Sequence, residues 1–339
     1  MTEYSNFEKR GAAVIHVPTD LVPTTSQGAL RFTNKASEAF AHLTFRRFRH
    51  LLSRERQDVT AIGAYAGETP ATSSAGASDS PVGLALVFWP PSKQQHTEAR
   101  LLSVMVDRAY RGTGAARALL ARAESAAVQR GCTSLAASYS SRLPCRRELE
   151  GLLGRAGWAA PEIAEMRTAG YAAAGVAEMD RLEASLRPYL PAGACLEPWS
   201  SVTAGERGEV DALVAAIEFK APLAPSLYEE KAHADLSLVL RHNGKIAGWV
   251  FGERESDDFC HYGCGYVVPA LRRRGALIGL IREVCRRQAA MFGPKSVAQL
   301  STTPQVPGMP RFMRERLGPC SLWYDEMWKT SKNFGSRLQ

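Results

Sequence analysis

The stretch RAYRGTGAARALL, residues 108–120, follows the apolar run LLSVMV at 101–106 and leads into an Ala- and Leu-rich segment without proline. This pattern predicts a strand, a turn with two glycines and a helix, in that order. The first turn of a helix leaves several backbone N–H groups unpaired, and these groups attract an anion. Gly112 and Gly114 allow close approach of a ligand and Arg111 adds a positive charge, so the turn is a candidate pyrophosphate cradle.

Two other phosphate-binding motifs do not fit this stretch. It contains no Gly-Lys-Ser/Thr, which excludes a P-loop, and Arg117 stands where a dinucleotide fingerprint has its third glycine. The alternative interpretation is a glycine-rich turn with a solvated arginine. A single occurrence of the motif leaves both interpretations open.

The same motif occurs a second time, as VVPALRRRGALIGLI at 267–281, again after an apolar run and again before a long apolar helix. The two copies are related by an offset of 161 residues. Equivalent pairs at this offset are Arg111 and Arg272, Gly114 and Gly275, Gly157 and Gly318, and Glu165-Met166 and Glu326-Met327. Repeated matches at one offset indicate a tandem duplication.

Each half is predicted to read helix, strand, strand, strand, Arg/Gly turn, helix, strand, helix, strand. The helix after each turn is expected to end at a glycine, Gly131 or Gly293. The first half also carries an insertion, GETPATSSAGASDS at 67–80, which is small and polar and is expected to be poorly ordered.

This order of elements, with these residues, resembles the GNAT superfamily of N-acyltransferases over nearly the whole chain. The family signature is Val-x-Pro-x-x-(Arg/Gln)-x-x-Gly-x-(Gly/Ala), whose amides bind the pyrophosphate of coenzyme A. The first half matches it with Val106, Arg111, Gly114 and Ala116, and has Arg108 where the family often has proline. The second half matches it with Val267, Pro269, Arg272 and Gly275, and has Leu277 at the last small position.

The resemblance implies an α/β fold with two GNAT-like domains in tandem, each a central twisted mixed sheet flanked by helices. We assign residues 1–170 to the N-terminal domain, 171–192 to a linker helix region and 193–339 to the C-terminal domain.

The resemblance also implies acetyl-CoA or another acyl-CoA as co-substrate. In the first half the implied coenzyme-binding residues are Val104, Val106, Arg111, Gly112, Thr113, Gly114, Ala115 and Ala116. In the second half they are Val267, Arg272, Arg273, Arg274, Gly275 and Ala276. Strand N–H groups around Val104 and Val106, or around Gly265 and Val267, would stabilise an oxyanion.

The usual side-chain catalysts of the family are missing from both halves. Leu153 and Arg314 stand where a tyrosine acid is often found, and the fourth strands have no carboxylate at their usual position. Substitute candidates are Glu98, His261, Tyr262 and Tyr139. The alternative for His261 is a strand-end residue without a catalytic role, and the alternative for Tyr139 is an aromatic ring that packs against the next helix. A reaction with a neutral amine and an unaided thiolate needs no side-chain catalyst.

Composition limits the cellular context. No apolar run approaches the length of a membrane span, and the N-terminus MTEYSNFEKR is not a signal peptide. Seven scattered cysteines do not suggest a disulfide framework. Cys260, His261 and Cys264 lack a second pair of metal ligands nearby, so no metal is expected. We expect a cytoplasmic protein without membrane contact.

The charge is unevenly distributed. Residues 171–258 carry a net charge of −7 and residues 259–339 a net charge of +9. The first half has one predicted helix that carries five arginines along its length: Arg46, Arg47, Arg49, Arg54 and Arg56. The apolar face of this helix is predicted to consist of Phe40, Leu43, Phe48, Leu51 and Leu52. Candidate polyanion contacts are Arg46, Arg47, Arg49, Arg286, Arg287, Arg311 and Arg314. The alternative is a solvated basic face.

The leading functional hypothesis is an N-acyltransferase that moves an acyl group, acetyl in the first instance, from acyl-CoA to the amine of a small molecule. The amine would attack directly, through a tetrahedral intermediate. One alternative is an aminoacyltransferase of the same fold that takes its donor group from aminoacyl-tRNA, held by the basic surface. The other is a non-catalytic pair of domains that binds a coenzyme or a protein as a regulatory module.

Overall fold

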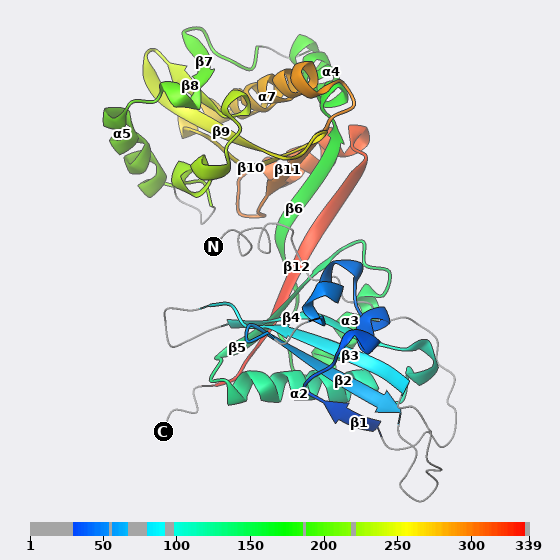
Figure 1. The fold of residues 1–339 in the computed structure, drawn as a ribbon. Coiled ribbons are helices and arrows are strands. Elements are labelled where there is room, and N and C mark those ends of the chain that lie inside the picture. The colour runs from blue at the N-terminus through cyan, green and yellow to red at the C-terminus, as the bar shows by residue number, and fades with distance from the viewer. Residues whose placement is uncertain are drawn as a thin grey trace, which may run out of the picture. The chain divides into compact units, whose positions relative to one another are not determined.

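The computed structural model describes residues 30–53, 56–66, 80–91, 98–185, 188–217 and 222–335. The chain divides into two compact units (Figure 1). The N-terminal unit comprises Met1–Ile163 with Met327–Gln339, and the C-terminal unit comprises Ala164–Glu326. The predicted mixed α/β architecture is confirmed in both units. The stretch 67–80, apart from Ser80, and Arg54 lie outside the described residues.

The N-terminal unit has a mixed sheet in the order β1-β2-β3-β4-β5-β12. Its strands are β1 (Leu30–Thr33), β2 (Val59–Ala66), β3 (Ser80–Phe88), β4 (Glu98–Val106), β5 (Ser134–Ser140) and β12 (Trp323–Asn333). β4 and β5 are parallel, and all other neighbours are antiparallel.

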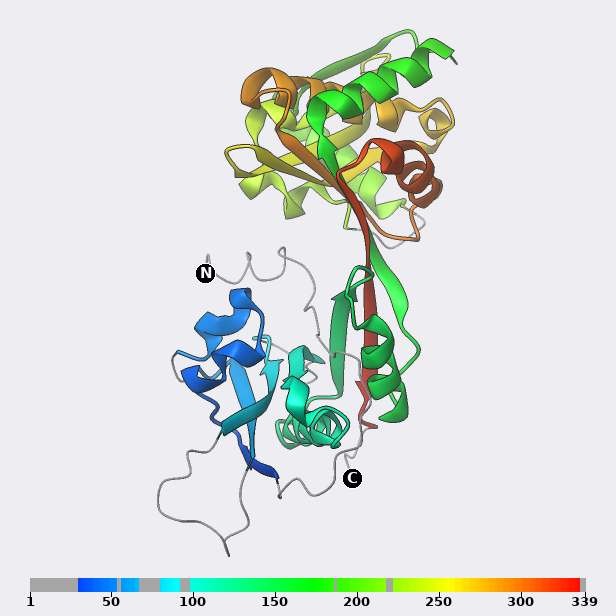
Figure 2. The same cartoon turned by 90° about the vertical axis from the view of Figure 1, so that its right-hand side faces the viewer.

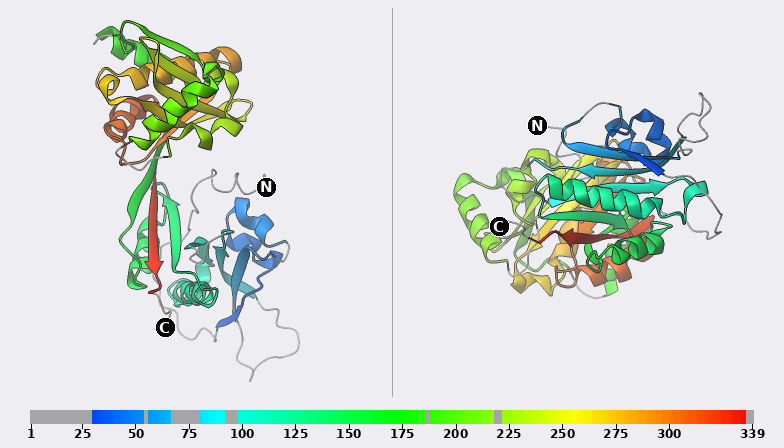
Figure 3. Two further views of the ribbon diagram at one scale, coloured as in Figure 1. Left: turned by 90° about the vertical axis from the view of Figure 1, so that its left-hand side faces the viewer. Right: turned by 90° about the horizontal axis from the view of Figure 1, so that it is seen from below.

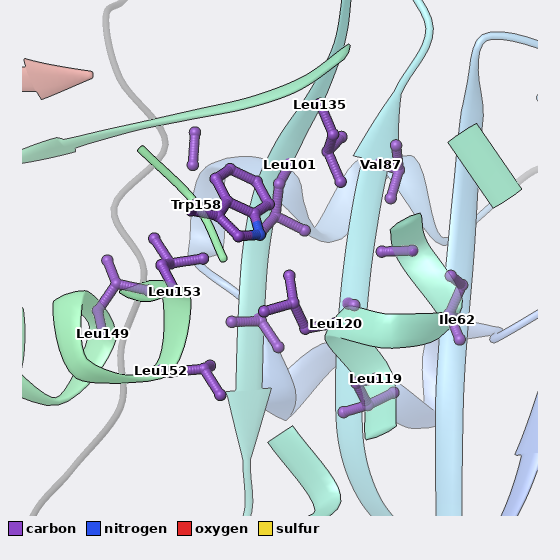
Figure 4. Close-up of a cluster of buried hydrophobic side chains, with 14 of the residues drawn as sticks. Ile62, Val87, Leu101, Leu119, Leu120, Leu135, Leu149, Leu152, Leu153 and Trp158 are labelled. Atoms are coloured by element: carbon purple, nitrogen blue, oxygen red, sulfur yellow. The ribbon is translucent and has the colours of Figure 1, made fainter. Parts of the chain in front are cut away.

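Helices cover both faces of this sheet, because side chains on successive strand residues point to opposite sides. Residues of α2 (Ala115–Gln129) and α3 (Arg146–Arg155) form one apolar core with the strands. Figure 4 shows this core, in which Leu119, Leu120, Leu149, Leu152 and Leu153 face Ile62, Val87, Leu101 and Leu135. Figure 3 shows α2 lying along one side of the sheet. A second apolar core on the other face contains Leu84, Leu86 and Leu102.

The prediction of a single helix around Arg46–Arg56 is wrong. The segment forms two short 3₁₀ helices, η1 (Glu38–Leu43) and η2 (Arg46–Leu51). They are separated because Thr44 and Phe45 have extended backbone conformations, and the Thr44 hydroxyl lies 3.2 Å from that of Ser103 on β4. The predicted apolar face is nevertheless buried, from Phe40 to Leu52.

The C-terminal unit repeats this plan with the strand order β6-β11-β10-β9-β8-β7. Its strands are β6 (Glu162–Tyr171), β7 (Ala194–Pro198), β8 (Leu238–His242), β9 (Lys245–Ser256), β10 (Phe259–Val267) and β11 (Val297–Thr302). β10 and β11 are its parallel pair. The equivalents of β4, α2 and β5 are therefore β10, α7 (Ala276–Phe292) and β11.

Further helices complete the C-terminal unit. The longer ones are α4 (Ala172–Ser185) and α5 (Ala204–Ala215); the short ones are α6 (Pro269–Arg272) and α8 (Met309–Phe312). Single turns are η4 (Trp199–Ser201), η5 (Pro225–Leu227), η6 (Glu229–Lys231), η7 (Ala234–Leu236), η8 (Met313–Leu317) and η9 (Gly318–Cys320). Trp249 and Phe251 lie in the core on the α5 side, and Leu280 and Val284 in the core under α7.

The two units complete their sheets with strands from distant parts of the sequence. β6 pairs with β11 from Met166 to Tyr171, and β12 pairs with β5 from Met327 to Asn333. Figure 2 shows β12, in red, beside β5. In the N-terminal unit the Thr330 hydroxyl donates to the carbonyl of Ala159 at 2.6 Å, which ties β12 to the segment between α3 and β6. The sequence predicted two domains, 1–170 and 193–339, that follow one another along the chain. In the structure, most of β6 belongs instead to the C-terminal unit, and the second half of β12 belongs to the N-terminal unit.

Candidate functional site

In each unit the two parallel strands diverge in the middle of the sheet. β4 pairs with β5 only from Glu98 to Leu101, and β10 pairs with β11 only from Phe259 to Tyr262. The remaining residues of β4 and β10 pair only with the strand on their other side. The backbone around Val104 and Val106, and around Gly265 and Val267, therefore faces a gap between strands.

A bulge accompanies each divergence. The register of β3 and β4 shifts around Leu102, and that of β9 and β10 shifts between His261 and Cys264. Leu102 and Gly263 are related by the same offset of 161 residues. A bulge leaves one residue out of the ladder and bends the strand, which opens backbone groups to a ligand.

The N-terminal Arg/Gly turn is built as the sequence predicts. Gly112 and Gly114 have φ values of 81° and 89°, in the left-handed region that favours glycine. Arg111 Nε donates to the Val106 carbonyl at 3.2 Å, and the Thr113 hydroxyl donates to the Tyr110 carbonyl at 2.7 Å. Burial and then the neighbouring Arg108 lower the pKa of Arg111. The turn is thus fixed by its own side chains.

This first turn is open. Among the described residues, no atom outside the turn lies within 4 Å of a Cβ atom placed on Gly112 or Gly114. Both glycines and Thr113 are exposed, whereas Ala115 is buried and Ala116 half-buried. The unpaired N–H groups at the start of α2 are accessible to an anion.

The C-terminal turn has the same backbone. Gly275 has φ 83° and Arg272 Nε donates to the Val267 carbonyl at 2.8 Å. Arg273 and Arg274 are exposed and Ala276 is buried. Without further neighbours this turn would be a second cradle.

The chain itself covers this second turn. A Cβ atom on Gly275 would lie 2.9 Å from Cδ1 of Tyr189, and one on Gly279 would lie 3.0 Å from Cδ2 of Leu190. The same construction on Gly265 meets Leu277 at 3.1 Å, so Leu277 lies against the strand where the family motif has a small residue. Tyr189 is buried, with an exposed fraction of 4%.

Hydrogen bonds hold Tyr189 in this place. Its hydroxyl donates to the Met179 carbonyl at 2.9 Å and its backbone N–H donates to Glu183 at 2.8 Å. Glu183 also forms an ion pair with Arg282 of α7. The C-terminal cradle is therefore filled by residues that follow α4. These residues were not identified from the sequence, which placed them only in the linker helix region 171–192.

The candidate catalytic residues of the N-terminal unit are engaged in other contacts. Glu98 lies 3.3 Å from Lys329 at the start of β4. Tyr139 is fully buried and its hydroxyl donates to Glu150 at 2.9 Å. Burial, followed by this hydrogen bond, raises the pKa of Tyr139. The phenol keeps its proton, but that proton is directed at Glu150.

His261 and Tyr262 are neighbours on β10 with different surroundings. The Tyr262 hydroxyl donates to Gln288 of α7 at 2.9 Å, and burial raises its pKa well above the ordinary value. His261 Nε2 lies 3.1 Å from the Ser301 hydroxyl on β11.

A carboxylate that the sequence analysis used only as a marker of the repeat, and not as a catalytic candidate, lies near His261. Glu165 on β6 hydrogen-bonds to Ser301, and burial raises its pKa. The structure therefore brings His261 together with Ser301 and Glu165. Pairing of β6 with β11 creates this cluster, and no local sequence pattern indicated it.

The arginines proposed as polyanion contacts are largely engaged with nearby groups. Arg286 and Arg287 each lie 2.8 Å from Glu283, Arg311 lies 2.8 Å from Glu315, and Arg314 lies 3.5 Å from Glu326. On η2 the Arg47 guanidinium lies 4.7 Å from the Phe48 ring, while Arg46 and Arg49 are on the same short helix. The ion pairs reduce the net positive charge of the C-terminal set.

Comparison with known proteins identifies the fold. Residues 35–147 match the model of the acetyltransferase (GNAT) family. Across both units the chain resembles a GCN5-related N-acetyltransferase from Sphaerobacter thermophilus, with 15% identity, a TM-score of 0.52 and coverage of 92% of this chain and 97% of that one.

The chain also resembles a tandem GNAT protein from the clavulanic acid biosynthesis pathway, at 16% identity and a TM-score of 0.50. This match covers 90% of this chain and 98% of that one. The two structures therefore support a GNAT fold in both units. A search of curated proteins finds no match.

Across the described parts of the chain, no helix combines the length and apolar character that a bilayer crossing needs. Nor do these parts bring together three or more His, Cys, Asp or Glu side chains in a cluster that could hold a metal ion.

Proposed function

We propose that the protein is an N-acyltransferase that transfers an acyl group, acetyl in the first instance, from acyl-CoA to the amine of a small molecule, and that the N-terminal unit binds the coenzyme. The observation that carries this proposal is the open Arg/Gly turn of a GNAT domain beside the diverging ends of β4 and β5. The matching turn of the C-terminal unit is covered by Tyr189 and Leu190.

The N-terminal unit offers three groups for this reaction. Backbone N–H groups at the start of α2, with Arg111 behind them, would hold the diphosphate. The gap beside β4 would receive the arm that carries the thioester. Backbone N–H groups near Val104 and Val106 would stabilise the oxyanion that forms when the amine nitrogen bonds to the carbonyl carbon. Collapse of this oxyanion breaks the C–S bond, so that the sulfur leaves as thiolate and the nitrogen gives up one proton to solvent.

The side chains on the second half of β4 offer no group that could take a proton from the amine. Residues 102–106, LSVMV, carry no titratable group. The amine would therefore reach the thioester already neutral. The rate is expected to rise with pH towards the pKa of the acceptor amine and then to level off.

The test is release of the coenzyme thiol from acetyl-CoA, measured with a thiol reagent in the presence of a panel of primary amines. The proposal expects amine-dependent release by the full chain and a strong loss in Arg111→Glu. Saturable binding of acetyl-CoA without release for any amine would contradict the proposal and support a non-catalytic module. No binding by folded protein would also contradict it, and aminoacyl-tRNA would then be the donor to examine.

A further inference from the structure

One side of η2 consists of two exposed arginines, Arg46 and Arg49. η2 is a 3₁₀ helix, in which side chains three residues apart lie one above the other. Phe48 and Leu51 form the buried row of this helix. Arg46 and Arg49 form another row at the same spacing, so their guanidinium groups are presented together.

The protein does not neutralise these two guanidinium groups. Within the described residues, the side chains of Arg46 and Arg49 take part in no ion pair, hydrogen bond or ring contact. By contrast, Arg47 lies over an aromatic ring at 4.7 Å, and Arg56 is paired with Asp58 at 2.9 Å. Two like charges on one row repel each other, and a bound anion would remove this repulsion.

A buried contact holds the start of η2 beside the proposed reaction centre. The Thr44 hydroxyl lies 3.2 Å from that of Ser103, and the two residues have exposed fractions of 4% and 0%. Ser103 follows the bulge at Leu102 and directly precedes Val104, near which an oxyanion would be stabilised. Arg46 follows Thr44 by two residues, a chain length of at most about 7 Å. The arginine pair therefore lies near the half of β4 that faces the gap.

The pair belongs to the face of the sheet that the coenzyme does not use. Phe48 and Leu51 pack in the core that contains Leu102, whereas α2 packs in the core on the other face. The cradle lies at the start of α2, so the acyl donor would reach the gap from the α2 side. The η2 side is then left for the acceptor.

The number of free cations limits the class of ligand. Two neighbouring guanidinium forks match a single carboxylate or phosphate group. A polyanion such as tRNA is held by a longer series of cations. The arginines Arg286, Arg287 and Arg311 of the C-terminal unit are already paired with carboxylates. A small anionic molecule therefore fits this pair better than a nucleic acid.

We propose, on the basis of the acyl transfer proposed above, that the acceptor amine carries an anionic oxygen group, a carboxylate or a phosphate, which Arg46 and Arg49 bind. This contact would hold the acceptor with its amine towards the gap beside β4. The two arginines would select the acceptor and would not transfer a proton, because a guanidinium stays charged in proteins.

The test uses acceptors that differ in the anionic group. The ω-amino acids from glycine to 6-aminohexanoate are each compared with their amides, and O-phosphoethanolamine is compared with ethanolamine. Thiol release from acetyl-CoA gives kcat/KM for each acceptor, and the ratio of charged to uncharged acceptor is compared between the full-length wild type and each variant, so that amine basicity cancels. Arg46→Gln and Arg49→Gln should each lower this ratio about tenfold for at least one pair, as loss of a charge-assisted hydrogen bond predicts.

The pair of compounds that responds identifies the anionic group. A lower ratio for the amino acids alone would indicate a carboxylate, and a lower ratio for O-phosphoethanolamine alone would indicate a phosphate. Arg155→Gln is the matched control, because Arg155 is an exposed arginine at the end of α3 in the same unit. It should leave every ratio within about twofold of the wild type.

Ratios that are equal in the wild type and both variants would overturn the assignment, while amine-dependent thiol release would still support the proposed function. Weaker binding of tRNA by the same variants would then assign the two arginines to a polyanion. If folded wild type released no thiol with any acceptor, the proposed function would fail, and this assignment would fail with it.

Discussion

The two Arg/Gly turns are nearly the same in backbone and opposite in surroundings. Arg111 and Arg272 make the same bond to the last carbonyl of the preceding strand, and Gly114 and Gly275 share a left-handed conformation. Gly114 faces open space, whereas Gly275 lies against Tyr189. A conserved backbone motif therefore does not establish a binding site, because whether its N–H groups reach a ligand depends on residues outside the motif.

In the C-terminal unit, the residues that cover the Arg/Gly turn contribute to the apolar core. Tyr189 and Leu190 bury apolar surface over the first turn of α7, and Glu183 connects this segment to Arg282. The start of α7 thereby joins the core, while the start of α2 remains at the surface. Four predictions follow from this contrast, from the largest expected effect to the smallest.

The removal of the Tyr189 ring should destabilise the C-terminal unit strongly. Tyr189→Ala deletes a buried aromatic side chain and a hydrogen bond, and comparable truncations cost about 3–5 kcal/mol. Tyr171→Ala, at a ring that is 40% exposed, is the control and should cost about 1 kcal/mol or less. Urea unfolding of both variants measures the free energies. Equal losses would show that Tyr189 does not fill the turn.

Alanine substitution at the two equivalent glycines should destabilise the protein more where the space beside the glycine is filled. Gly114→Ala and Gly275→Ala both force a left-handed conformation, at about 1–2 kcal/mol. Gly275→Ala also brings a methyl group within 2.9 Å of Tyr189, which adds about 1–3 kcal/mol for overpacking. Thermal and urea unfolding should show the larger loss for Gly275→Ala. A larger loss for Gly114→Ala would reverse the comparison.

Charge reversal at the two arginines should affect coenzyme binding in only one unit. Arg111→Glu is expected to weaken acetyl-CoA binding about tenfold or more, because it replaces a cation behind the open cradle by an anion. Arg272→Glu, the matched variant, should leave the dissociation constant within about twofold of wild type. Calorimetry with variants shown to be folded by circular dichroism distinguishes them. Loss of binding only in Arg272→Glu would contradict the account.

The contribution of Glu183 should depend on pH. Burial alone would raise the pKa of Glu183, but bonds from the Tyr189 N–H and Arg282 hold it below its ordinary value. A carboxyl whose folded pKa is lowered stabilises fully above its unfolded pKa of about 4.3, and this stabilisation is lost as pH falls through the folded pKa. The difference in unfolding free energy between wild type and Glu183→Gln should therefore shrink from pH 7 to pH 3. A constant difference would exclude this linkage.

The sequence was sufficient for the parts of the fold that local pattern determines. The strand, glycine turn and helix around Arg111 and Arg272, and the helix ends at Gly131 and Gly293, appear where the motif and the offset predicted them. Glycine positions and apolar periodicity determine turns, strands and helices through residues that are close in the sequence, so these elements can be predicted from the sequence.

The exchange of β6 and β12 could not be predicted in this way. The pairing of Met327–Asn333 with β5 joins residues almost 200 positions apart, and edge choice leaves no local signal. The cover over Gly275 is equally non-local, because Tyr189 lies far from that turn in sequence. The segment that begins at Thr44 interrupts the predicted first helix through a contact with Ser103, which is again a tertiary effect.

The number of acetyl-CoA molecules bound per chain tests the central claim most directly. Calorimetric titration of the wild-type protein should give one site, in the N-terminal unit, because among the described residues Tyr189 and Leu190 cover the C-terminal cradle and nothing covers the N-terminal one. Two sites per chain would contradict the conclusion that Tyr189 and Leu190 close the second cradle. No heat of binding from folded protein, at several temperatures, would contradict the assignment of the first cradle to the coenzyme.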